Sequence, residues 1–467
     1  MTTEKKERMT RLFAPKSVAV IGASEKFDKL GFHVMKSLTK GGYGGVIIPV
    51  NPGADTIMGI KVFKSMLDYE GIIDLAIIVV PAKFVPQVID ECAKKGVGGI
   101  VLITAGFREI DDPDGAVLQK KLAEKADGYG IPVIGPNTFG IVNRHHDLNA
   151  SFTPEFSLLN KGKISLVSQS GGMSHLLSFM AIRNDIGFGK IIGLGNRLNV
   201  DFMEMVEFLM DDADTDVIAL YMEGIDTPVP LMEAIKSRHG KKPIVAYKTG
   251  SSKVGNMASR SHTGSLAGMH DIYTGAFRQA GVVVVDEAET FLDVAKAMTA
   301  KSFPRGPNIA VLSGQAGPGM AACDAAEMNG LELTRFSQQT QKKINELLPP
   351  LALRTNPVDM GPAWYDGPAT TEIVKAAMLD ENVDAVILLI MYASANLKSV
   401  HGISDMLIEW NQKKPIITCI SAPPGIWDRE LDKLDQEGAI SNYPTPERAA
   451  RVLARLWEYK KQQDSLE

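Results

Sequence analysis

His262 is the residue whose surroundings first suggest chemistry. Its neighbours in the segment 258–268 are all small except for one arginine and one leucine. An imidazole in such an open segment is accessible to a phosphorylated intermediate, and histidine can act as a nucleophile or a general base. A lone histidine in a polar loop is otherwise a solvated surface residue. The remaining motifs have to decide whether His262 is a catalytic histidine or a solvated one.

Three Gly-rich turns, each between an expected strand and an expected helix, offer backbone N–H groups to an anion. They lie in the segments 17–24, 164–172 and 309–319. A helix start stabilises an anion by about 0.3–1 kcal/mol when exposed and by up to about 2 kcal/mol when partly buried. The alternative is that glycine only allows helix and strand to pack closely. The residues predicted to bind phosphate are Ser170, Gly171 and Gly172 in the second turn and Gly317 and Gly319 in the third.

Glu223 follows the apolar run 217–222 and precedes Gly224. A strand of this kind delivers one carboxylate to the edge of a sheet. A carboxylate that holds one ring nitrogen of a histidine fixes the tautomer and makes the other nitrogen more nucleophilic. We therefore predict that Glu223 orients His262, the alternative being a solvated turn or a helix cap.

The turn after the first strand departs from the dinucleotide-binding fingerprint. That fingerprint needs glycine at positions 24 and 27, where this chain has Ser24 and Phe27. The second strand also ends in Val50-Asn51-Pro52 rather than in an acidic residue for a ribose hydroxyl. NAD is therefore disfavoured, although another nucleotide-like ligand still fits at the carboxyl ends of the strands. Each of these turns taken alone is equally well an ordinary turn.

The elements that must position these residues alternate between short apolar strands and amphipathic helices such as 84–95 and 203–210. Near-continuous apolar strands joined by helices indicate parallel sheets covered on both faces. A polar stretch at 144–162 and a proline-rich stretch at 301–307 separate three such series. We expect an α/β protein with three doubly wound domains, 1–145, 146–305 and 306–467. The expected strands are 17–22, 46–50, 74–80, 99–104 and 131–135, then 163–168, 190–194, 217–222, 244–248 and 282–286, then 309–313, 331–335, 385–390 and 415–420.

The composition is that of a globular protein and excludes several functions. Of the 467 residues, 45% are hydrophobic and 22% are charged, and no apolar run approaches the roughly 18 residues of a membrane span. The amino terminus, 1–8, mixes both charge signs and is interpreted as a solvated lead-in, so we expect a cytoplasmic protein with no membrane contact. A formal charge of −5 disfavours nucleic acid as a partner.

Cysteine usage and missing motifs narrow the chemistry further. Cys92, Cys323 and Cys419 all lie in apolar patterns, which predicts buried free thiols in a reducing compartment and no metal site. The chain contains neither a P-loop nor a Gly-x-Ser-x-Gly nucleophile elbow. We therefore expect no tight binding of ATP by this chain alone.

Five motifs, read together, resemble the NDP-forming acyl-CoA synthetase superfamily, and the likeness covers residues 11–456. The Ser-His-Thr-Gly and Gly-Ala-Ser segments are more similar to its ADP-forming acetate–CoA ligase branch than to succinyl-CoA synthetase, a more distant relative. The motifs are Ile103-Thr104-Ala105-Gly106-Phe107-Arg108-Glu109, Gly135-Pro136-Asn137-Thr138-Phe139-Gly140, Ser168-Gln169-Ser170-Gly171-Gly172, Ser259-Arg260-Ser261-His262-Thr263-Gly264 and Asn356-Pro357-Val358-Asp359.

The resemblance implies a Rossmann-like CoA-binding domain followed by two flavodoxin-like domains, of which the first carries a phosphohistidine at His262. It implies an α subunit, because the sequence ends at Glu467 without an ATP-grasp region. ADP or ATP and Mg²⁺ would lie on a β subunit in an α2β2 assembly. The implied CoA contacts are Gly22, Ala23, Ser24, Asn51, Pro52, Val80, Pro81, Ala105, Gly106 and Asn137.

The reaction implied is acyl-CoA + ADP + phosphate ⇌ carboxylic acid + CoA + ATP, by way of an acyl phosphate. The acid stays open between acetate, a branched or aromatic acid and a hydroxy acid. Two alternatives stand beside this hypothesis: a CoA-binding regulatory or scaffold protein without catalysis, and a nicotinamide-dependent oxidoreductase. The presence of both His262 and Glu223 disfavours the regulatory or scaffold protein. The oxidoreductase is disfavoured by Ser24, Phe27 and Asn51.

Overall fold

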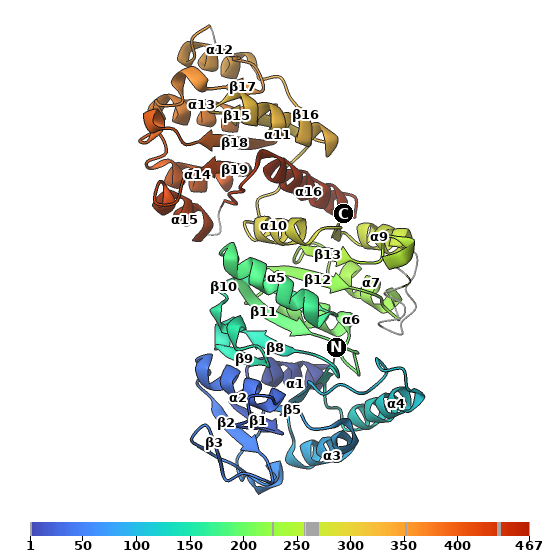
Figure 1. Ribbon diagram of the computed structural model, residues 1–467. Coiled ribbons are helices and arrows are strands. Elements are labelled where there is room, and N and C mark those ends of the chain that lie inside the picture. The colour runs from blue at the N-terminus through green and yellow to red at the C-terminus, as the bar shows by residue number, and fades with distance from the viewer. Residues whose placement is uncertain are drawn as a thin grey trace. The chain divides into compact units, whose positions relative to one another are not determined.

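A computed structural model of the chain describes residues 2–226, 228–255, 257, 270–350, 353–436 and 440–466. Strands alternate with helices throughout, and the strands form three larger sheets and one small hairpin (Figure 1). The chain divides into two compact units, Met1–Ala288 and Glu289–Glu467. No helix within the described ranges is long and apolar enough to cross a membrane.

The first sheet is entirely parallel, in the order β2-β1-β5-β6-β7. Each strand lies where an apolar run predicted one, because the strands are almost wholly buried. Strand β1 lies between β2 and β5, so the strand order reverses at β1, and parallel sheets bind ligands beyond the carboxyl ends of the strands at such a point. The elements are β1 (Ser17–Ile21), α2 (Leu30–Lys40), β2 (Val46–Val50), β3 (Thr56–Ile57), β4 (Ile60–Lys61), η1 (Met66–Asp68), β5 (Leu75–Ile78), η2 (Ala82–Phe84), α3 (Val85–Lys95), β6 (Gly99–Leu102), α4 (Pro113–Gly128) and β7 (Val133–Ile134).

The second sheet belongs to the same compact unit and has seven strands in the order β14-β13-β12-β10-β11-β8-β9. Its first five strands are parallel, whereas β8 and β9 are antiparallel to their neighbours. The elements are β8 (Gly140–Asn143), η3 (Arg144–His146), β9 (Leu148–Ser151), η4 (Pro154–Leu158), β10 (Lys161–Ser168), α5 (Gly171–Arg183), β11 (Phe188–Gly193), α6 (Phe202–Asp211), β12 (Val217–Met222), α7 (Pro228–Lys236), β13 (Ile244–Lys248), α9 (His270–Gln279) and β14 (Val283–Val285).

The polar stretch 144–162 contains the buried strand β9, which the sequence pattern did not predict. Its polar side chains are satisfied inside the fold. The Ser151 hydroxyl donates to Asn149 Oδ1 at 2.6 Å, and Asn149 Nδ2 donates to the Thr153 carbonyl at 3.0 Å. Hydrogen bonds of this kind let asparagine and serine occupy a buried strand, so the polarity of this stretch concealed β9.

Residues 3–8 of the expected solvated lead-in are exposed or half-exposed, but they form the first part of helix α1 (Thr3–Phe13). Its apolar side, which includes Leu12 and Phe13, is buried. Its charged side is tied to helix α6 by Lys5 and Lys6, which pair with Glu204 at 3.0 Å and Asp211 at 2.8 Å. The mixed charges that suggested a free terminus are ion-pair partners.

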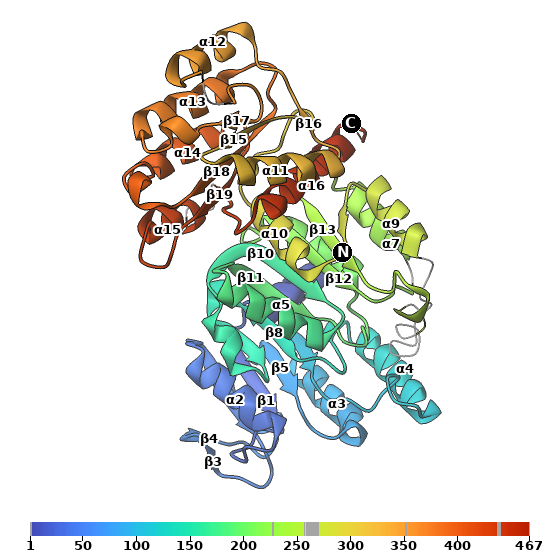
Figure 2. The same ribbon diagram turned by 45° about the horizontal axis from the view of Figure 1, so that its top comes forward.

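The third sheet lies in the second compact unit and is also parallel, in the order β16-β15-β18-β19 with β17 paired to β15. Helices α11 and α16 lie side by side in both views (Figures 1 and 2). The elements are α10 (Ala288–Met298), β15 (Asn308–Ser313), α11 (Ala316–Met328), β16 (Glu332–Leu333), α12 (Gln338–Leu347), β17 (Val358–Asp359), η5 (Gly361–Ala363), α13 (Gly367–Leu379), β18 (Ala385–Met391), η6 (Ser394–Asn396), α14 (Ile403–Asn411), β19 (Ile416–Ser421), α15 (Asp428–Gln436) and α16 (Pro446–Asp464).

Helix α10 belongs to this second unit, although the expected third domain started at residue 306. Arg448 of α16 forms a two-pronged ion pair with Asp293 of α10, at 2.7 and 2.8 Å. The Tyr443 hydroxyl donates to the Asp293 carbonyl at 2.7 Å. These contacts fasten α10 to the carboxyl-terminal helix. The expected division into three domains follows the three larger sheets, two of which lie together in the first compact unit.

Two of the three cysteines are buried free thiols, as predicted, whereas Cys323 is only half-buried. Burial raises the pKa of Cys323 to about 11 and that of Cys419 to about 12. Both groups are therefore neutral thiols near pH 7, which makes them poor nucleophiles.

Candidate functional site

The residues expected to contact CoA lie on neighbouring turns at the carboxyl edge of the first sheet. Hydrogen bonds join one turn to the next: Asn51 Nδ2 donates to the Ala23 carbonyl at 2.8 Å, and Thr104 Oγ1 donates to the Val80 carbonyl at 2.7 Å. The Asn137 N–H donates to the Thr104 carbonyl at 2.9 Å. The five turns thus form one continuous rim, which is the geometry expected of a ligand site in a parallel sheet.

Glycine is needed twice where helix α2 begins. Gly22 has a φ of +96°, and a Cβ on Gly31 would lie 2.0 Å from the Gly22 carbonyl oxygen. Helix α2 can therefore approach the first turn only because Gly31 lacks a side chain, and the turn itself needs glycine at position 22 for its positive φ. The helix also starts without a side-chain cap, so its first N–H groups have no acceptor from that source.

The N–H group of Gly106, one of the predicted CoA contacts, already has a partner within the chain. Glu109 Oε1 accepts from the N–H groups of Gly106 at 2.5 Å and Phe107 at 3.2 Å, and Glu109 Oε2 accepts from Asn196 Nδ2 at 2.5 Å. Burial raises the pKa of the Glu109 carboxyl, but these hydrogen bonds outweigh it and hold the pKa below its usual value. A charged carboxylate therefore closes this turn and bonds to the loop after β11.

The predicted phosphate site of the second sheet lies at the start of α5. Ser170 caps the helix, with its Oγ accepting from the Met173 N–H at 3.4 Å. A Cβ placed on Gly171 or Gly172 would meet nothing within 4 Å, so the space in front of the first helical turn is open. N–H groups in a first helical turn have no acceptor within the helix. This arrangement suits an oxyanion.

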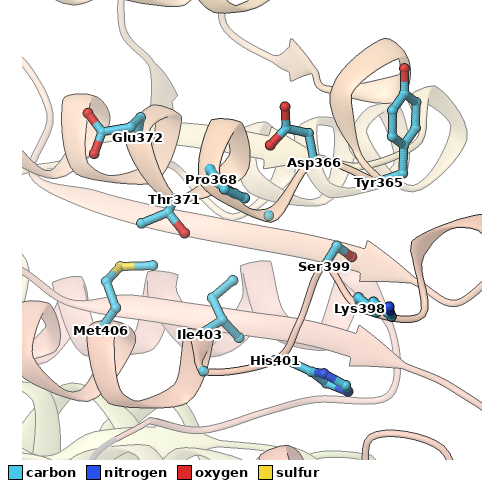
Figure 3. Close-up of a pocket in the computed structure, with 12 residues that line it drawn as sticks. Tyr365, Asp366, Pro368, Thr371, Glu372, Lys398, Ser399, His401, Ile403 and Met406 are labelled. Carbon is cyan, nitrogen blue, oxygen red and sulfur yellow. The ribbon is translucent and has the colours of Figure 1, made fainter.

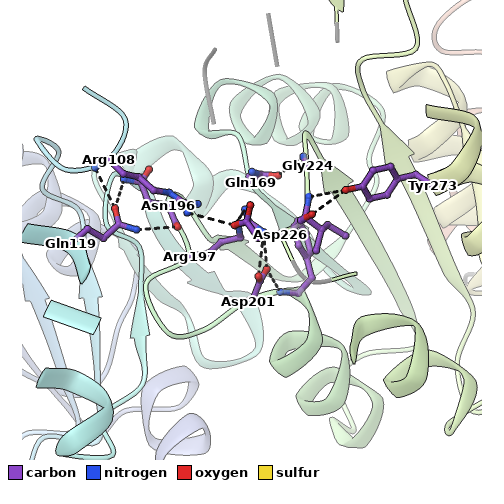
Figure 4. Close-up of polar contacts among 11 residues, drawn as sticks. Arg108, Gln119, Gln169, Asn196, Arg197, Asp201, Gly224, Asp226 and Tyr273 are labelled. Atoms are coloured by element: carbon purple, nitrogen blue, oxygen red, sulfur yellow. Dashed lines mark hydrogen bonds and ion pairs between the residues drawn. The ribbon is translucent and has the colours of Figure 1, made fainter. Parts of the chain in front are cut away.

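Glu223 lies next to that turn, since β12 is the neighbour of β10. Gln169 Oε1 accepts from the N–H groups of Glu223 at 2.9 Å and Gly224 at 3.1 Å. The Tyr273 hydroxyl donates to the Ile225 carbonyl at 3.0 Å (Figure 4). Side chains from the turn after β10 and from α9 thus fix the backbone that presents the Glu223 carboxylate.

Two arginines, neither of which was predicted as a site residue, complete this network (Figure 4). Arg197 has a buried side chain that pairs with Asp226 at 3.0 Å and Asp201 at 3.2 Å. Arg108, on the turn after β6, lies 3.5 Å from the same Asp226 carboxylate. Burial and the charge of Arg197 lower the pKa of Arg108, against the opposite effect of Asp226. The network connects the turns of the first sheet with the turn of Glu223.

Lys248 was also missed. It is the last residue of β13 and only 2% exposed, and its Nζ donates to the Thr249 carbonyl. Burial lowers the pKa of this lysine, while the negative charge of Glu223 acts in the opposite direction. One signal was present in the sequence, because Lys248 ends a strand that is otherwise almost entirely apolar.

The remaining predicted phosphate residues lie at the start of α11 in the second unit. A Cβ on Gly317 would meet open space, whereas a Cβ on Gly319 would lie 3.1 Å from the Ser313 Cβ. Gly319 therefore has a packing reason to be glycine, and only Gly317 faces free space. His262 lies outside the described residues, so its geometry with Glu223 stays a prediction.

The second unit also contains a hollow of about 750 Å³ between the starts of α13 and α14 (Figure 3). Its two acidic side chains have partners: Asp366 accepts from the Ala369 N–H at 3.1 Å, and Glu372 pairs with Lys375 at 3.3 Å. None of the predicted site residues lines it. Within the described ranges, no group of three His, Cys, Asp or Glu side chains is placed to hold a metal ion.

Known proteins provide the comparison for this geometry. The chain matches the CoA binding domain family over residues 16–144 and the succinyl-CoA ligase like flavodoxin domain family over residues 161–298. It is 38% identical to the alpha subunit of acetate–CoA ligase (ADP-forming) II of Pyrococcus furiosus, covering 96% of this chain and 97% of that one. It is 36% identical to acetate–CoA ligase (ADP-forming) I of Archaeoglobus fulgidus, covering 97% of this chain and 64% of that one.

Among solved structures, the chain is similar to the dinucleotide-forming acetyl-coenzyme A synthetase 1 of Ca. Korarchaeum cryptofilum in complex with phosphate and ADP. The TM-score is 0.88 at 32% identity, covering 98% of both chains. These matches define a class, the CoA ligases that join a CoA-binding domain to a succinyl-CoA-ligase-like flavodoxin domain. Within that class, the chain belongs to the ADP-forming acetate–CoA ligase family, as its motifs predicted.

Proposed function

We propose that this chain is the α subunit of an ADP-forming acid–CoA ligase and that His262 carries the phosphoryl group from the thioester site to a partner subunit. The main support for the proposal is a pair of hydrogen bonds between the two predicted parts of the site, the turn before α5 and the turn of Glu223. Gln169, in the turn that starts α5, holds the backbone of Glu223. This contact supports the proposal because it brings the predicted anion site and the predicted orienting carboxylate to the same sheet edge.

The chemistry follows from these two parts. An oxygen of inorganic phosphate bonds to the acyl carbon as the C–S bond breaks, which releases the thiolate of CoA and gives an acyl phosphate. A ring nitrogen of His262 then bonds to phosphorus, and the bond from phosphorus to the carboxylate oxygen breaks. Glu223 accepts a hydrogen bond from the N–H of the other ring nitrogen and stabilises the resulting cation. The start of α5, Ser170 to Gly172, stabilises the negative charge of the phosphoryl group during its transfer.

CoA is assigned to the rim of the first sheet. The contacts are proposed on the turns of Gly22–Ser24, Asn51–Pro52, Val80–Pro81, Ala105–Gly106 and Asn137. The uncapped start of α2 lies against the first of these turns and suits a phosphate of CoA. Gly317 and Gly319 are proposed as further phosphate contacts in the second unit.

The partner is proposed to be an ATP-grasp β subunit that holds ADP or ATP with Mg²⁺ in an α2β2 assembly. Two observations support this. The Pyrococcus furiosus relative is named a subunit alpha, and the chain spans nearly its whole length. The Archaeoglobus fulgidus relative is longer, and the chain covers 64% of it. The acid is proposed to be small, as in the relatives named for acetate, and the location to be the cytoplasm.

The decisive experiment follows transfer of ³²P from labelled phosphate to the chain in the presence of acetyl-CoA. The wild-type chain should acquire an acid-labile, base-stable label, and His262→Asn should remove both the label and net ATP formation with the partner while CoA still binds. His146→Asn is the matched control, because His146 is exposed in η3 and has no assigned role. Normal turnover of His262→Asn, or a label on another residue, would contradict the proposal.

The alternative, a CoA-binding regulatory or scaffold protein, is distinguished by the same experiment. Such a protein would show a rise in melting temperature with CoA but no label from acetyl-CoA and phosphate. The structure offers no separate observation in favour of this alternative, whereas the fixed position of Glu223 beside α5 favours catalysis.

A further inference from the structure

Two successive carbonyl groups at the start of α5 accept hydrogen bonds from side chains. The Ser170 carbonyl accepts from Ser168 Oγ at 2.9 Å and from Ser174 Oγ at 2.8 Å. The Gly171 carbonyl accepts from Nδ1 of His175 at 2.7 Å. A serine hydroxyl that bonds to the carbonyl four residues earlier slightly destabilises a helix, so these contacts require a reason other than helix stability.

The same two peptide groups carry the N–H groups that are predicted to bind phosphate. The Ser170 carbonyl shares a peptide group with the Gly171 N–H, and the Gly171 carbonyl shares the next one with the Gly172 N–H. Ser170 Oγ caps the Met173 N–H. Within the described ranges, neither the Gly171 nor the Gly172 N–H has an acceptor. A hydrogen bond to a carbonyl polarises its peptide group and strengthens the bond that its N–H donates by about 10–30%.

The His175 ring is held from several sides. Because a carbonyl only accepts, Nδ1 carries a hydrogen in this contact whether the ring is neutral or charged. Nε2 lies 2.7 Å from Thr153 Oγ1. The ring also packs against Phe139 and Phe156, with centroid distances of 5.8 and 4.9 Å. These contacts keep Nδ1 directed at the Gly171 carbonyl.

The start of α11 provides a comparison within the chain, because its turn also follows a strand that ends in serine. Counted from the first residue of each helix, Gly319 and Met320 take the places of Ser174 and His175. Neither glycine nor methionine has a side-chain group that donates a hydrogen bond. Donors at these two positions therefore accompany only one of the two predicted phosphate turns.

We infer that His175 and Ser174 are positioning residues for inorganic phosphate: their hydrogen bonds orient and polarise the two peptide groups whose N–H groups bind the phosphate that attacks the thioester. Both side chains act through the backbone and neither touches the phosphate. The inference rests on the proposed phosphate site at the start of α5. It goes beyond that proposal, because it names the side chains that set the affinity of the site.

His175→Leu tests the inference, because leucine can pack among the phenylalanine rings but cannot donate a hydrogen bond. His175→Asn is the conservative variant, since an asparagine amide can reach the carbonyl four residues earlier, as Asn184 and Asn329 do at 2.7 and 2.8 Å. Asn184→Leu is the matched control. It removes the hydrogen bond to the Met180 carbonyl at the other end of the same helix.

The KM for phosphate and the KM for acetyl-CoA are measured separately, in ATP formation by the chain and its partner at saturating ADP. We expect the KM for phosphate to rise at least about threefold in His175→Leu and in Ser174→Ala, and about tenfold in the double variant. The KM for acetyl-CoA should change less than about twofold, because the predicted CoA contacts lie on the first sheet. His175→Asn should recover most of the affinity for phosphate, and Asn184→Leu should match the wild type.

NMR spectra of the chain labelled with ¹⁵N in its eight histidines provide a readout that needs no turnover. The signals that disappear in His175→Asn belong to His175, and they should show a hydrogen on Nδ1. Added phosphate should shift these signals, because the peptide group between Gly171 and Gly172 connects the ring to the anion. A His175 ring without a hydrogen on Nδ1 would contradict the inference.

Two kinetic results would also overturn it: an equal rise of the KM for phosphate in His175→Leu and Asn184→Leu, or a KM for acetyl-CoA that rises as much as that for phosphate. If His175→Leu does not fold, Ser174→Ala decides between the same outcomes. A wild-type chain that forms no ATP and takes no label would instead contradict the proposed function. Equilibrium dialysis with ³²P-labelled phosphate then tests the inference by itself, with the same losses of affinity expected.

Discussion

The turn between β10 and α5 and the turn between β15 and α11 are built alike, although they lie in different compact units. In each, a serine ends the strand and its hydroxyl donates to the carbonyl two residues on, Ser168 to Ser170 and Ser313 to Gln315. In each, a glutamine holds the end of the neighbouring strand. Gln169 accepts from the Glu223 N–H, and Gln315 accepts from the Met391 N–H at 3.2 Å.

The surroundings of the two turns differ in charge. In the second sheet, Met222 pairs in register with Lys248 and is followed by Glu223. In the third sheet, the equivalent residue Ile390 pairs in register with Ile420 and is followed by Met391. The same turn geometry therefore offers N–H groups in both places, whereas a buried lysine and a carboxylate accompany only the first. The comparison shows that the two turns share their geometry and differ in the charge beside them, which is why we propose acceptor chemistry for the first turn only.

The largest effect that would separate the two turns is expected from Glu223→Gln. Loss of the orienting charge should lower the rate of ³²P labelling by about a hundredfold without abolishing it, because the nucleophile remains. Met391→Leu, at the corresponding position, should leave labelling unchanged. Equal losses in the two variants would show that the turns share the chemistry and would break the comparison.

A smaller effect is expected from the two glutamines. Gln169→Leu and Gln315→Leu each remove an acceptor from a backbone N–H group, so each should lower the free energy of unfolding by about 1–3 kcal/mol, measured by urea denaturation. Only Gln169→Leu should also slow labelling, by about tenfold, because only Gln169 holds Glu223. A labelling defect of the same size in Gln315→Leu would contradict this assignment.

The smallest effect concerns the glycines. A Cβ on Gly171 meets open space, so Gly171→Ala should raise the free energy of unfolding by up to about 0.5–1 kcal/mol. A Cβ on Gly319 would lie 3.1 Å from the Ser313 Cβ, so Gly319→Ala should lower it by about 1 kcal/mol. Thermal denaturation of both variants checks the signs. A decrease for Gly171→Ala or an increase for Gly319→Ala would mean that the two helix starts are not packed as described.

The sequence predicted the strands of the sheets well, because strands buried on both faces are apolar throughout. It failed where polar residues are satisfied inside the fold, as in β9, and where charges have distant partners, as in α1. Glu223 could be proposed from its place after a strand. Gln169, Arg197 and Lys248 could not, because their roles depend on partners from 25 to 54 residues away or on other elements. Such pairings leave no local pattern in a sequence.

The Glu109 carboxylate has a thermodynamic consequence for ligands of the first sheet. Hydrogen bonds to a charged group contribute about 1.5–3 kcal/mol each, and Glu109 accepts from Gly106, Phe107 and Asn196 at once. A ligand that takes the N–H groups of Gly106 and Phe107 must compete with this internal anion. The free energy of binding of such a ligand is then the difference between the hydrogen bonds that the turn makes to the ligand and those that it makes to Glu109. Each binding event replaces the carboxylate oxygen of Glu109 by an oxygen of the ligand.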